Sequence, residues 1–504
     1  MGCNIIVDAN PHQTRVAVVE DNALSEIYFE RKGSERIVGN IYKGVVANVL
    51  PGMQAAFVNI GYDKNAFLYA GDIAVDNTEF EFEGSKTLEP ASISDIVKQG
   101  EEIVVQVLKE PGDTKGARIT TNVTLPGRLS VIMPTVDYVG VSRRICDEDE
   151  RVRLKEIAER VKPEGVGVIV RTAAIGKNSA ELEDEICFLA RLWGRVKQRA
   201  ELVNAPRMIH SEDSLIFRTV RDMLNENIDA MYINDIDMFE RVKVVSDMIA
   251  PKLSDKIKLF TEHYDIFDYF AIEEAVDRTM QRRVWLKSGG YLIIDQTEAL
   301  TVIDINTGKY VGTVNFDKTA LQTNLEAATE IARQLRLRDI SGIIVIDFID
   351  MKLDENRESV MERLRTALKK DRTKSNVIGM TGLGLVEMTR KKVRQPVRSA
   401  LTKQCTYCHG DGRIENEDTV AMKARKQLLR EINETDFPVF VIEVHTSVAQ
   451  HITKSCEDAF KNMPGGEGRK VFLKPISGTH MCGVKVYGVK NTFVIDMNGI
   501  IRLA

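Results

Sequence analysis

The sequence predicts an α/β protein made of several small subdomains, one of which is a β-barrel. Apolar patterns typical of strands and helices alternate along most of the 504 residues. Between residues 36 and 123, however, short strands follow one another with glycine-containing turns between them. Residues 416–504 have a separate small α/β pattern. The length alone suggests about three or four domains.

The opening segment, residues 4–31, predicts strands that cannot fold alone. Apolar runs at 5–7 and 15–19 flank the turn-like Asn10-Pro11-His12, and residues 24–29 suit a third strand. Because so short a segment is below the size of a domain, we expect it to complete a core built later in the chain.

Residues 36–123 predict a small closed barrel of the OB type. Its five strands are expected at 39–49, 54–60, 65–69, 102–109 and 117–123. The interruption at 75–95 carries Glu79, Glu81 and Glu83 together with Gly, Ser and Pro, which is typical of a surface loop.

The middle of the chain mixes both kinds of element. We expect strands at 129–133, 166–171 and 230–233, and helices at 149–161, 181–201, 215–224 and 239–248. A hairpin of 290–295 and 299–306 gives the strongest β signal in the chain. It precedes a helix at 324–337 and an apolar strand at 342–348, whose nearly continuous pattern is typical of burial on both faces.

The C-terminal part begins with a basic tract and ends in the small module. Residues 389–404 include Arg390, Lys391, Lys392, Arg394, Arg398 and Lys403 and no acid. For the module we expect helices at 420–432 and 448–460 and strands at 439–444 and 471–475.

The overall composition excludes few classes of function once the distribution of charge along the chain is considered. With 69 Lys and Arg against 74 Asp and Glu, the net charge is −5, which alone argues against a nucleic-acid partner. The basic tract and the barrel lysines are offset by acidic segments elsewhere, so the sum hides a local separation. Apolar runs far shorter than ~20 residues predict no membrane span. The seven cysteines, few and odd in number, fit a reducing cytoplasm.

Two aspartates interrupt hydrophobic strands. Asp304 lies between β-branched residues, and Asp347 follows the run of 343–346. A carboxylate in such a strand is costly unless it is paired or binds a metal. If the strands are neighbours, the acids would repel each other without a cation between them, and Mg²⁺ prefers such oxygen ligands. The alternative is that the acids cap helices or pair with arginines.

Cys405 and Cys408 have the spacing of a zinc knuckle, and glycines follow them. Zinc usually needs four ligands, and the chain has no second pair with this spacing. Either His409 and a distant cysteine complete the site, or two chains each give one pair. The other interpretations are ordinary thiols or a redox motif, and the strand-to-helix context of a redox motif is missing.

Two weaker patterns concern nucleic acid. Phe57 and Phe67 lie on successive barrel strands with Lys43, Lys109 and Lys115 nearby in sequence, which suits single-stranded nucleic acid or, equally, a barrel core. Arg171-Thr172 ends a strand and could hold a terminal phosphate, although an ordinary surface arginine is the commoner case.

Taken together and in this order, these segments resemble the ribonuclease E/G family from the first strand to the C-terminal module. The resemblance rests on Ile37-Val38-Gly39-Asn40-Ile41-Tyr42-Lys43-Gly44, Ala55-Ala56-Phe57-Val58, Gly140-Val141-Ser142-Arg143-Arg144-Ile145, Val170-Arg171-Thr172-Ala173, Thr297-Glu298-Ala299-Leu300, Asp304-Ile305-Asn306-Thr307-Gly308, and a long stretch from Asn324-Leu325-Glu326-Ala327-Ala328 to Ile346-Asp347-Phe348-Ile349-Asp350-Met351.

The resemblance implies an endoribonuclease that cleaves single-stranded, A/U-rich RNA, leaves a 5′-phosphate and acts in rRNA maturation and RNA decay. It implies that Asp304 and Asp347 hold Mg²⁺ and that Asn306 orients the site. The remaining implied roles are an RNA channel at Phe57, Phe67, Lys109 and Lys115, a 5′-monophosphate pocket at Gly127, Val131, Arg171 and Thr172, and a zinc ion that Cys405 and Cys408 share with a second chain.

The resemblance also implies the subdomains. They are a split ribonuclease H-like subdomain (1–35 and 215–278), an S1-type OB-fold domain (36–125), a 5′-end sensor (126–214), a DNase I-like catalytic subdomain (279–400), a zinc link (401–415) and a small C-terminal domain (416–504). The acidic loop at 75–95 departs from the family's barrel. Ending at Ala504, the chain resembles the shorter, ribonuclease G-type members. We expect a homodimer or a higher oligomer, without a long scaffold for degradation partners.

Overall fold

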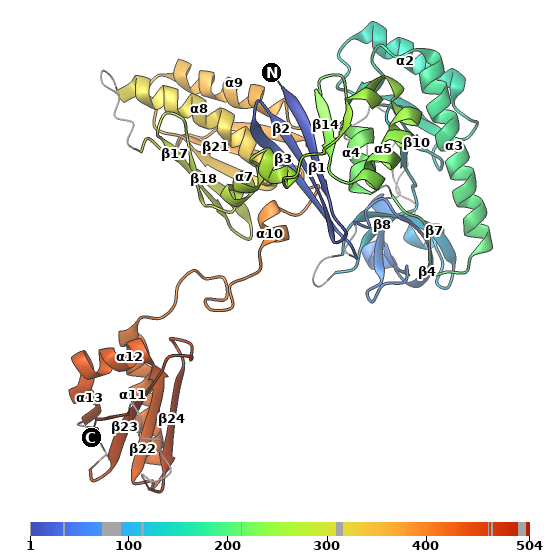
Figure 1. The fold of residues 1–504 in the computed structure, drawn as a ribbon. Helices are drawn as coiled ribbons and strands as arrows, with labels where there is room; N and C mark the ends of the chain where they lie inside the picture. The colour runs from blue at the N-terminus through green and yellow to red at the C-terminus, as the bar shows by residue number, and fades with distance from the viewer. Residues whose placement is uncertain are drawn as a thin grey trace. The chain divides into compact units, whose positions relative to one another are not determined.

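The computed structural model describes residues 2–33, 36–72, 92–111, 115–212, 214–308, 316–461, 463–464, 467–491 and 500–503. The chain divides into two compact units, Met1–Ala400 and Leu401–Ala504 (Figure 1). Most of the acidic loop predicted at 75–95, namely 75–91, lies outside the described residues, and the helix α1 (Ile93–Ile96) follows it. No described helix has the length and apolar character needed to cross a membrane.

The N-terminal strands join a sheet completed far along the chain, as their shortness required. β1 pairs in parallel with β14, and β14 pairs in parallel with β15. The order of the sheet is β15 (Ile257–Leu259), β14 (Ala230–Ile233), β1 (Cys3–Ala9), β2 (Gln13–Glu20) and β3 (Ala23–Arg31). Its neighbours in sequence are α4 (Leu215–Asp222), α5 (Ile236–Ile249), α6 (Ile266–Tyr269) and α7 (Ile272–Thr279).

The predicted small barrel is confirmed. The described strands close in the order β4 (Ile41–Leu50), β5 (Ala55–Asn59), β6 (Ala66–Tyr69), β8 (Arg118–Thr120) and β7 (Glu102–Lys109), with β7 pairing back to β4. A further strand, β13 (Arg207–His210), pairs antiparallel with the first residues of β4, on the edge opposite to β7. The core of the barrel is apolar and includes Val58, Leu68 and Ile119.

A smaller sheet follows the barrel. Its order is β11 (Val139–Val141), β12 (Gly167–Val170), β10 (Ser130–Met133) and β9 (Leu125–Pro126), and its helices are α2 (Glu148–Val161) and α3 (Ser179–Leu202). The helix α3 begins at a capping box, in which Asn178 and Glu181 satisfy each other's backbone N–H groups. Leu182, Ile186 and Leu189 then face the sheet core at helical spacing.

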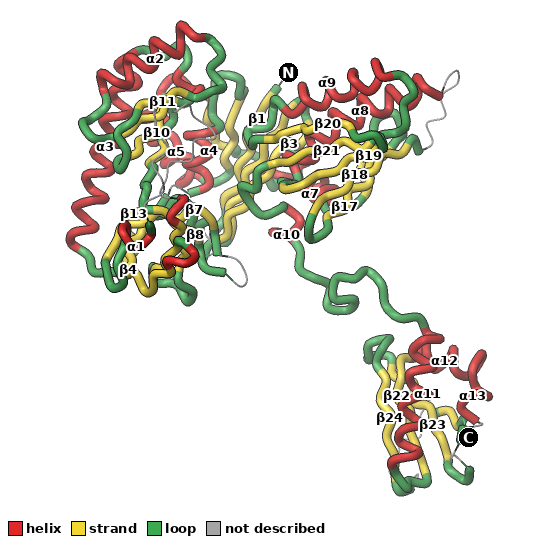
Figure 2. The backbone as a smooth tube through the Cα atoms, turned by 180° about the vertical axis from the view of Figure 1, so that it is seen from behind, coloured by secondary structure: helices red, strands yellow, loops and turns green. Residues whose placement is uncertain are grey.

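The next sheet, called here the carboxylate sheet, carries Asp304 and Asp347. Its order is β16 (Arg283–Trp285), β17 (Tyr291–Gln296), β18 (Leu300–Asn306), β19 (Gly342–Asp347), β21 (Leu385–Arg390) and β20 (Ser375–Met380). The parallel pair β18 and β19 is joined through α8 (Phe316–Leu337), as parallel strands require a long crossover. Figure 2 shows the sheet with α8 and α9 (Asp354–Leu368) beside it.

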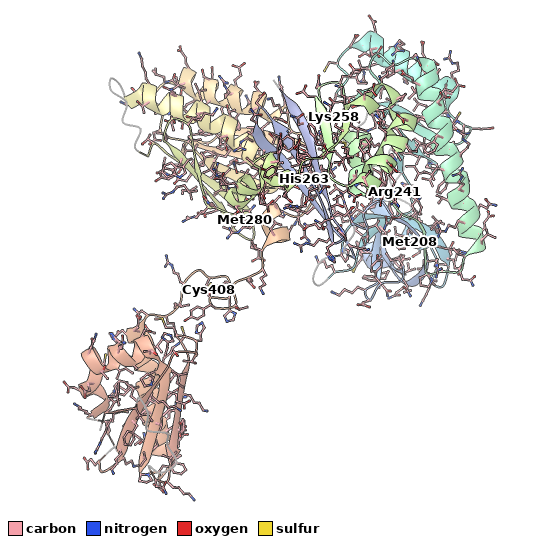
Figure 3. All side chains as sticks on the ribbon, in the orientation of Figure 1. Met208, Arg241, Lys258, His263, Met280 and Cys408 are labelled. Carbon is pink, nitrogen blue, oxygen red and sulfur yellow. The ribbon has the colours of Figure 1, made fainter. Side chains whose placement is uncertain are left out.

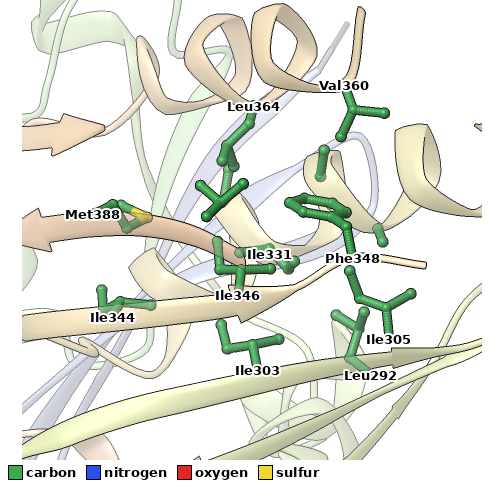
Figure 4. Packing of buried hydrophobic residues seen from close by; sticks show 14 of the residues in the cluster. Leu292, Ile303, Ile305, Ile331, Ile344, Ile346, Phe348, Val360, Leu364 and Met388 are labelled. Atoms are coloured by element: carbon green, nitrogen blue, oxygen red, sulfur yellow. The ribbon is translucent and has the colours of Figure 1, made fainter. Parts of the chain in front are cut away.

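Only one face of the carboxylate sheet is covered by these helices. Ile303, Ile344 and Ile346 point toward Ile331 of α8 and Leu364 of α9 (Figure 4). On the opposite face, by contrast, Ile343 is 53% exposed. The prediction that residues 342–348 are buried on both faces is therefore wrong, because the sheet has no second helical layer there in the described chain.

Arginines inside the first unit connect its elements. Arg336 of α8 binds Glu20 and Glu26 on β2 and β3. Arg390 is 3% exposed and binds Asp339 and Asp371. In the basic tract 389–404, Arg394 also binds Asp339, so part of this positive charge is neutralised internally rather than presented to a partner.

The second unit is a sheet in the order β24 (Val484–Val489), β22 (Val439–His445), β23 (Lys470–Ile476) and β25 (Ile501–Arg502), with α11 (Glu417–Glu434), α12 (Thr446–His451) and α13 (Glu457–Lys461). The helix predicted at 448–460 is interrupted by a π-helical turn at Ile452–Cys456. β24 was not among the predicted strands. α10 (Val397–Leu401) spans the residues at which the first unit gives way to the second along the chain.

Candidate functional site

Asp304 and Asp347 are direct neighbours on the carboxylate sheet. β18 and β19 are parallel, and these two residues pair in register at their carboxyl ends. Since Ile303, Ile305 and Ile346 point into the core, the alternation of a strand places both carboxylates on the open face. The structure therefore brings together the two acids that the sequence singled out.

The electrostatics of the pair favour a cation. Burial, followed by the nearby charges of Asp304 and Asp350, raises the pKa of Asp347. Within the described chain, neither Asp304 nor Asp347 forms a salt bridge with a lysine or arginine. The predicted alternative, in which these acids pair with arginines, thus finds no partner among the described residues.

Asn306 lies two residues after Asp304 on the same face of β18. Its side-chain amide donates a 2.8 Å hydrogen bond to Asp304 Oδ2. The bond fixes the orientation of the Asp304 carboxylate. It engages Oδ2, so Oδ1 accepts no hydrogen bond from Asn306. This contact fits the orienting role that the resemblance implies for Asn306.

Asn324 is a supporting residue that the sequence analysis did not identify as functional. It is fully buried on α8, and its amide binds the backbone of Ile349 twice, through Nδ2 to the carbonyl at 2.8 Å and through Oδ1 from the N–H at 3.1 Å. The contact anchors the segment between Asp347 and Asp350. A buried asparagine on an otherwise apolar helix face was the signal available in the sequence.

Phe57 and Phe67 form the centre of an aromatic and cationic row on the barrel. They pair across β5 and β6, and their ring centroids lie 5.9 Å apart with an edge-to-face angle of 62°. Phe67 also pairs with Arg118, which in turn pairs with Lys109. Because directly paired residues share a face, these four side chains form one line across β5, β6, β8 and β7.

The other barrel cations differ in their surroundings. Lys115 is exposed beside β8. Lys43, by contrast, binds the Glu102 carboxylate at 2.8 Å and the Val203 carbonyl at 3.0 Å. Arg118 was missed from sequence because strand register, which places it beside Phe67, cannot be deduced from one chain; it binds the Asp72 carboxylate through two nitrogens.

Gly127, Val131, Arg171 and Thr172 come together around β10 and β12. Val131 pairs with Ile169, and the backbone N–H of Arg171 donates to the Leu129 carbonyl. The Arg171 guanidinium binds the Gly127 carbonyl at 2.6 Å and Asp222 Oδ1 at 2.8 Å. Arg171 is therefore held in place by a carboxylate, and Thr172 is exposed beside it.

A second carboxylate organises the turn before β10. Glu185 of α3 accepts hydrogen bonds from the backbone N–H groups of Arg128, Leu129 and Ser130. A Cβ atom on Gly127 would lie 2.5 Å from Glu185 Oε1, so this approach requires glycine. The turn is thus an anion-binding nest that the chain fills with its own side chain.

Cys405 and Cys408 lie on the irregular segment before α11, where Figure 3 labels Cys408. Backbone N–H groups of Cys408 and Tyr407 lower the pKa of the Cys405 thiol, which favours the thiolate that zinc binds. Tyr407 stacks on His480 at 4.1 Å between ring centroids, and His480 Nε2 donates to the Tyr407 carbonyl at 2.6 Å. These contacts fix the segment against the loop before β24.

The pair lacks a third ligand within its own described chain. Among the described residues, the compact set of three metal-binding side chains consists of Asp418, His451 and Cys456, and it includes neither Cys405 nor Cys408. His409, which could have completed the pair, is exposed and does not join such a set. Within the described residues, these two cysteines therefore stand as a pair of possible zinc ligands.

Comparison with known proteins gives a family match over the regions just described. The model of the "Ribonuclease E/G family" matches residues 124–393, which contain both the predicted phosphate pocket and the carboxylate sheet.

Whole-chain relatives agree with this match. The chain is 45% identical to "Ribonuclease G" of Haemophilus influenzae, over 93% of this chain and 96% of the relative. It is 43% identical to "Ribonuclease G" of Escherichia coli K12, over 89% of this chain and 92% of the relative. Identity to "Ribonuclease E" of Escherichia coli K12 is 37%, over 86% of this chain but only 41% of that longer protein.

Proposed function

Because the chain belongs to the ribonuclease E/G family and is an endoribonuclease, we propose that it cleaves single-stranded, A/U-rich RNA at a Mg²⁺ site held by Asp304 and Asp347. The products carry 5′-phosphate ends, and the substrates are rRNA precursors and mRNA. The observation that carries the proposal is the in-register pair of aspartates on the open face of the carboxylate sheet.

The side chains present fit Mg²⁺. Two carboxylates at the ends of parallel strands offer hard oxygen ligands and leave room for the waters that Mg²⁺ keeps. Burial and, after it, the nearby charges of Asp304 and Asp350 raise the pKa of Asp347, and a divalent cation would relieve the repulsion between the two acids. When bound, Mg²⁺ supplies an activated water and stabilises the negative charge on the phosphate under attack.

The protein's own groups position the reaction. Asn306 holds the Asp304 carboxylate, and Asn324 anchors the chain after Asp347, so both ligands keep their separation. The row of Phe57, Phe67 and Lys109 offers stacking surfaces and positive charge to an unpaired strand. Arg171 and Thr172 receive the 5′-monophosphate. Asp222 holds the Arg171 guanidinium in place before the phosphate binds, and the phosphate then binds the guanidinium either instead of Asp222 or together with it.

We further propose that Cys405 and Cys408 share one zinc ion with the same pair of a second chain, which gives a homodimer. The depressed thiol pKa of Cys405 and the missing third ligand in the described chain support this arrangement. The enzyme works in the cytoplasm, which suits seven cysteines that form no disulfide among the described residues.

The test is cleavage of one RNA sequence with either a 5′-monophosphate or a 5′-triphosphate, with and without Mg²⁺. D304N and D347N should each reduce the cleavage rate by more than about 100-fold. Removing a residue that only hydrogen-bonds to a metal ligand already costs about 10–100-fold, and these variants change the ligands themselves. RNA binding should change little. D295N is the matched control, since Asp295 lies on β17 of the same sheet and pairs with Arg282.

Cleavage that persists in both aspartate variants would show that the reaction occurs elsewhere. If the wild-type chain binds RNA but shows no Mg²⁺-stimulated cleavage, the carboxylate pair is not a nuclease site. Equal cleavage of the two 5′-end forms would remove the monophosphate pocket from the proposal and leave the carboxylate site standing.

A further inference from the structure

Three planar side chains lie beside the carboxylates on the open face of the carboxylate sheet. Arg283 and Trp285 belong to β16, and Tyr291 begins β17. We propose that these three residues form a stacking subsite for a nucleobase of the RNA strand held at Asp304 and Asp347. The inference rests on the proposed function and extends it to how the substrate is held.

Strand register places the subsite. Trp285 pairs with Tyr291, and Tyr291 pairs with Asn306, so these three residues form one line across β16, β17 and β18. Because neighbouring strands lie roughly 4.8 Å apart, Trp285 lies about 10 Å from Asn306 along this line. This is a distance that a neighbouring nucleotide can span.

A second line of paired residues runs through the acids. Arg283 pairs with Ile293, Ile293 with Asp304, and Asp304 with Asp347. The intervening residues Val284, Leu292 and Ile294 pack into the core on the helical side. By strand alternation, all members of both lines therefore face the open side of the sheet.

The three planar groups are in mutual contact. The ring centroids of Trp285 and Tyr291 lie 5.3 Å apart, at an interplanar angle of 64°. The Arg283 guanidinium carbon lies 4.5 Å from the Tyr291 centroid and 5.5 Å from the Trp285 centroid. Arg283 also forms no salt bridge with any residue in the described part of the chain, so its charge is available to a phosphate.

Trp285 is 59% exposed, which is a large apolar surface to leave in water. Single exposed apolar residues are ordinary on protein surfaces and need no function. This one differs because an aromatic ring and a guanidinium share its position and because the same face carries the carboxylate pair. Aromatic rings with arginine are the groups that stack on unpaired bases, largely without regard to sequence.

The chain after β18 ties the subsite to the acids. Gly308 has a φ of +59°, and a Cβ atom there would lie 2.4 Å from the Gly289 carbonyl oxygen and 3.3 Å from Tyr291 Cδ1. Only glycine allows this approach. The backbone that leaves Asn306 thus packs against the Tyr291 ring, so Tyr291 and Asn306 are held as one surface.

The chain has two tryptophans, which makes the subsite observable directly. W193F leaves Trp285 as the reporter, and W285F leaves Trp193, which lies on α3 beside Lys197. Single-stranded RNA with a 5′-hydroxyl end, added without Mg²⁺, should quench the emission of the W193F protein with a saturating curve. The emission of the W285F protein should stay unchanged over the same titration.

Kinetics give the second measurement. W285A should raise KM roughly tenfold, in line with the loss of one base-stacking contact, while kcat changes little. W285F should restore most of the lost affinity, because it keeps an aromatic face. R283Q should raise KM and weaken its dependence on salt, since a phosphate contact would be lost.

Outcomes for the subsite and for the nuclease site are separable. If RNA binds, as measured by the anisotropy of a labelled strand, and Trp285 emission does not change, the stacking subsite is wrong while the nuclease proposal stands. If Trp285 is quenched but D304N and D347N still cleave, the nuclease proposal is wrong and the subsite stands as an RNA-binding surface. An unchanged KM in W285A also contradicts the subsite.

Discussion

At the scale of single residues, the carboxylate pair is unfavourable for stability when no cation is present. Asp304 and Asp347 face each other in register, and like charges at such positions cost roughly 0.2–1 kcal/mol. Burial and the charges of Asp304 and Asp350 raise the pKa of Asp347. A carboxyl whose folded-state pKa is raised destabilises the fold as the pH rises through that value.

We therefore predict that D347N is more stable than the wild-type chain in EDTA at neutral pH, by roughly 0.2–1 kcal/mol. The difference should shrink at an acidic pH below the raised pKa of Asp347, where the wild-type carboxyl is protonated and the repulsion is lost. Chemical denaturation at both pH values, followed by circular dichroism, measures this.

Mg²⁺ provides the control for that measurement. It should stabilise the wild-type chain and leave D347N nearly unaffected, because only the wild type keeps both ligands. A D347N variant that is less stable than wild type in EDTA would mean that Asp347 has a structural partner.

Sequence alone identified these acids because a charge in an apolar strand is conspicuous. Trp285 and Arg118 were not identified, because their importance comes from the residues paired beside them. A shift of one residue in strand register would move either side chain to the other face. Asn324 was missed for a related reason: its backbone partner, Ile349, lies in the loop after β19, and the position of that loop cannot be deduced from the sequence.

At the scale of elements, the turn before β10 depends on one helix. The Glu185 carboxylate of α3 accepts the backbone N–H groups of Arg128, Leu129 and Ser130, together with the Ser130 hydroxyl. This turn carries Gly127, whose carbonyl binds Arg171. The shape of the predicted phosphate pocket therefore rests on a side chain that lies outside it.

We predict that E185A lowers the free energy of unfolding by about 1–3 kcal/mol, because buried backbone donors lose their acceptor. It should also reduce the preference for 5′-monophosphorylated RNA, because the turn that carries the Gly127 carbonyl would shift and this carbonyl binds the Arg171 guanidinium. E185Q keeps one acceptor oxygen and should lose less. Denaturation curves and paired cleavage rates on the two 5′-end forms measure both effects.

Glu183 of the same helix is the matched control, because it is exposed and two residues away. E183Q should leave stability and 5′-end preference unchanged. If E185A keeps the full preference while losing stability, the nest is structural only and the pocket does not depend on it.

Elements with a regular period were predictable, and those with broken periods were not. α3 was expected at 181–201 and extends over Ser179–Leu202. The helix expected at 448–460 is interrupted at Ile452–Cys456, because an apolar pattern does not distinguish an α-helical turn from a π-helical one. Likewise, the apolar run in β19 predicted burial on both faces, whereas helices cover one face and leave the other for the carboxylates.

At the scale of the whole molecule, distant segments complete one another. β1 pairs with β14 across more than 200 residues, and Arg336 joins α8 to Glu20 and Glu26. Burial opposes the charged form of Glu26, but Arg336 and Arg372 outweigh it and lower its pKa. The sequence indicated that residues 4–31 must pack against a segment later in the chain. Only the family resemblance, and no local pattern, identified residues 215–278 as that segment.

At this scale, the proposed homodimer depends on the pair Cys405 and Cys408. In the proposed dimer, Cys405 and Cys408 supply half of a tetrahedral zinc site, because the described residues of one chain offer no third ligand beside them. The double variant C405S/C408S should therefore lose its zinc and change from dimer to monomer, as measured by native mass spectrometry and light scattering.

C146S/C187S is the matched control, because both of its thiols are exposed and lie away from Cys405 and Cys408 in the sequence. This variant should keep its zinc and remain a dimer. A dimer that persists in C405S/C408S without zinc would move the interface to another surface of the chain, such as the C-terminal module. One zinc per monomer in the wild type would mean that a ligand within the same chain completes the site.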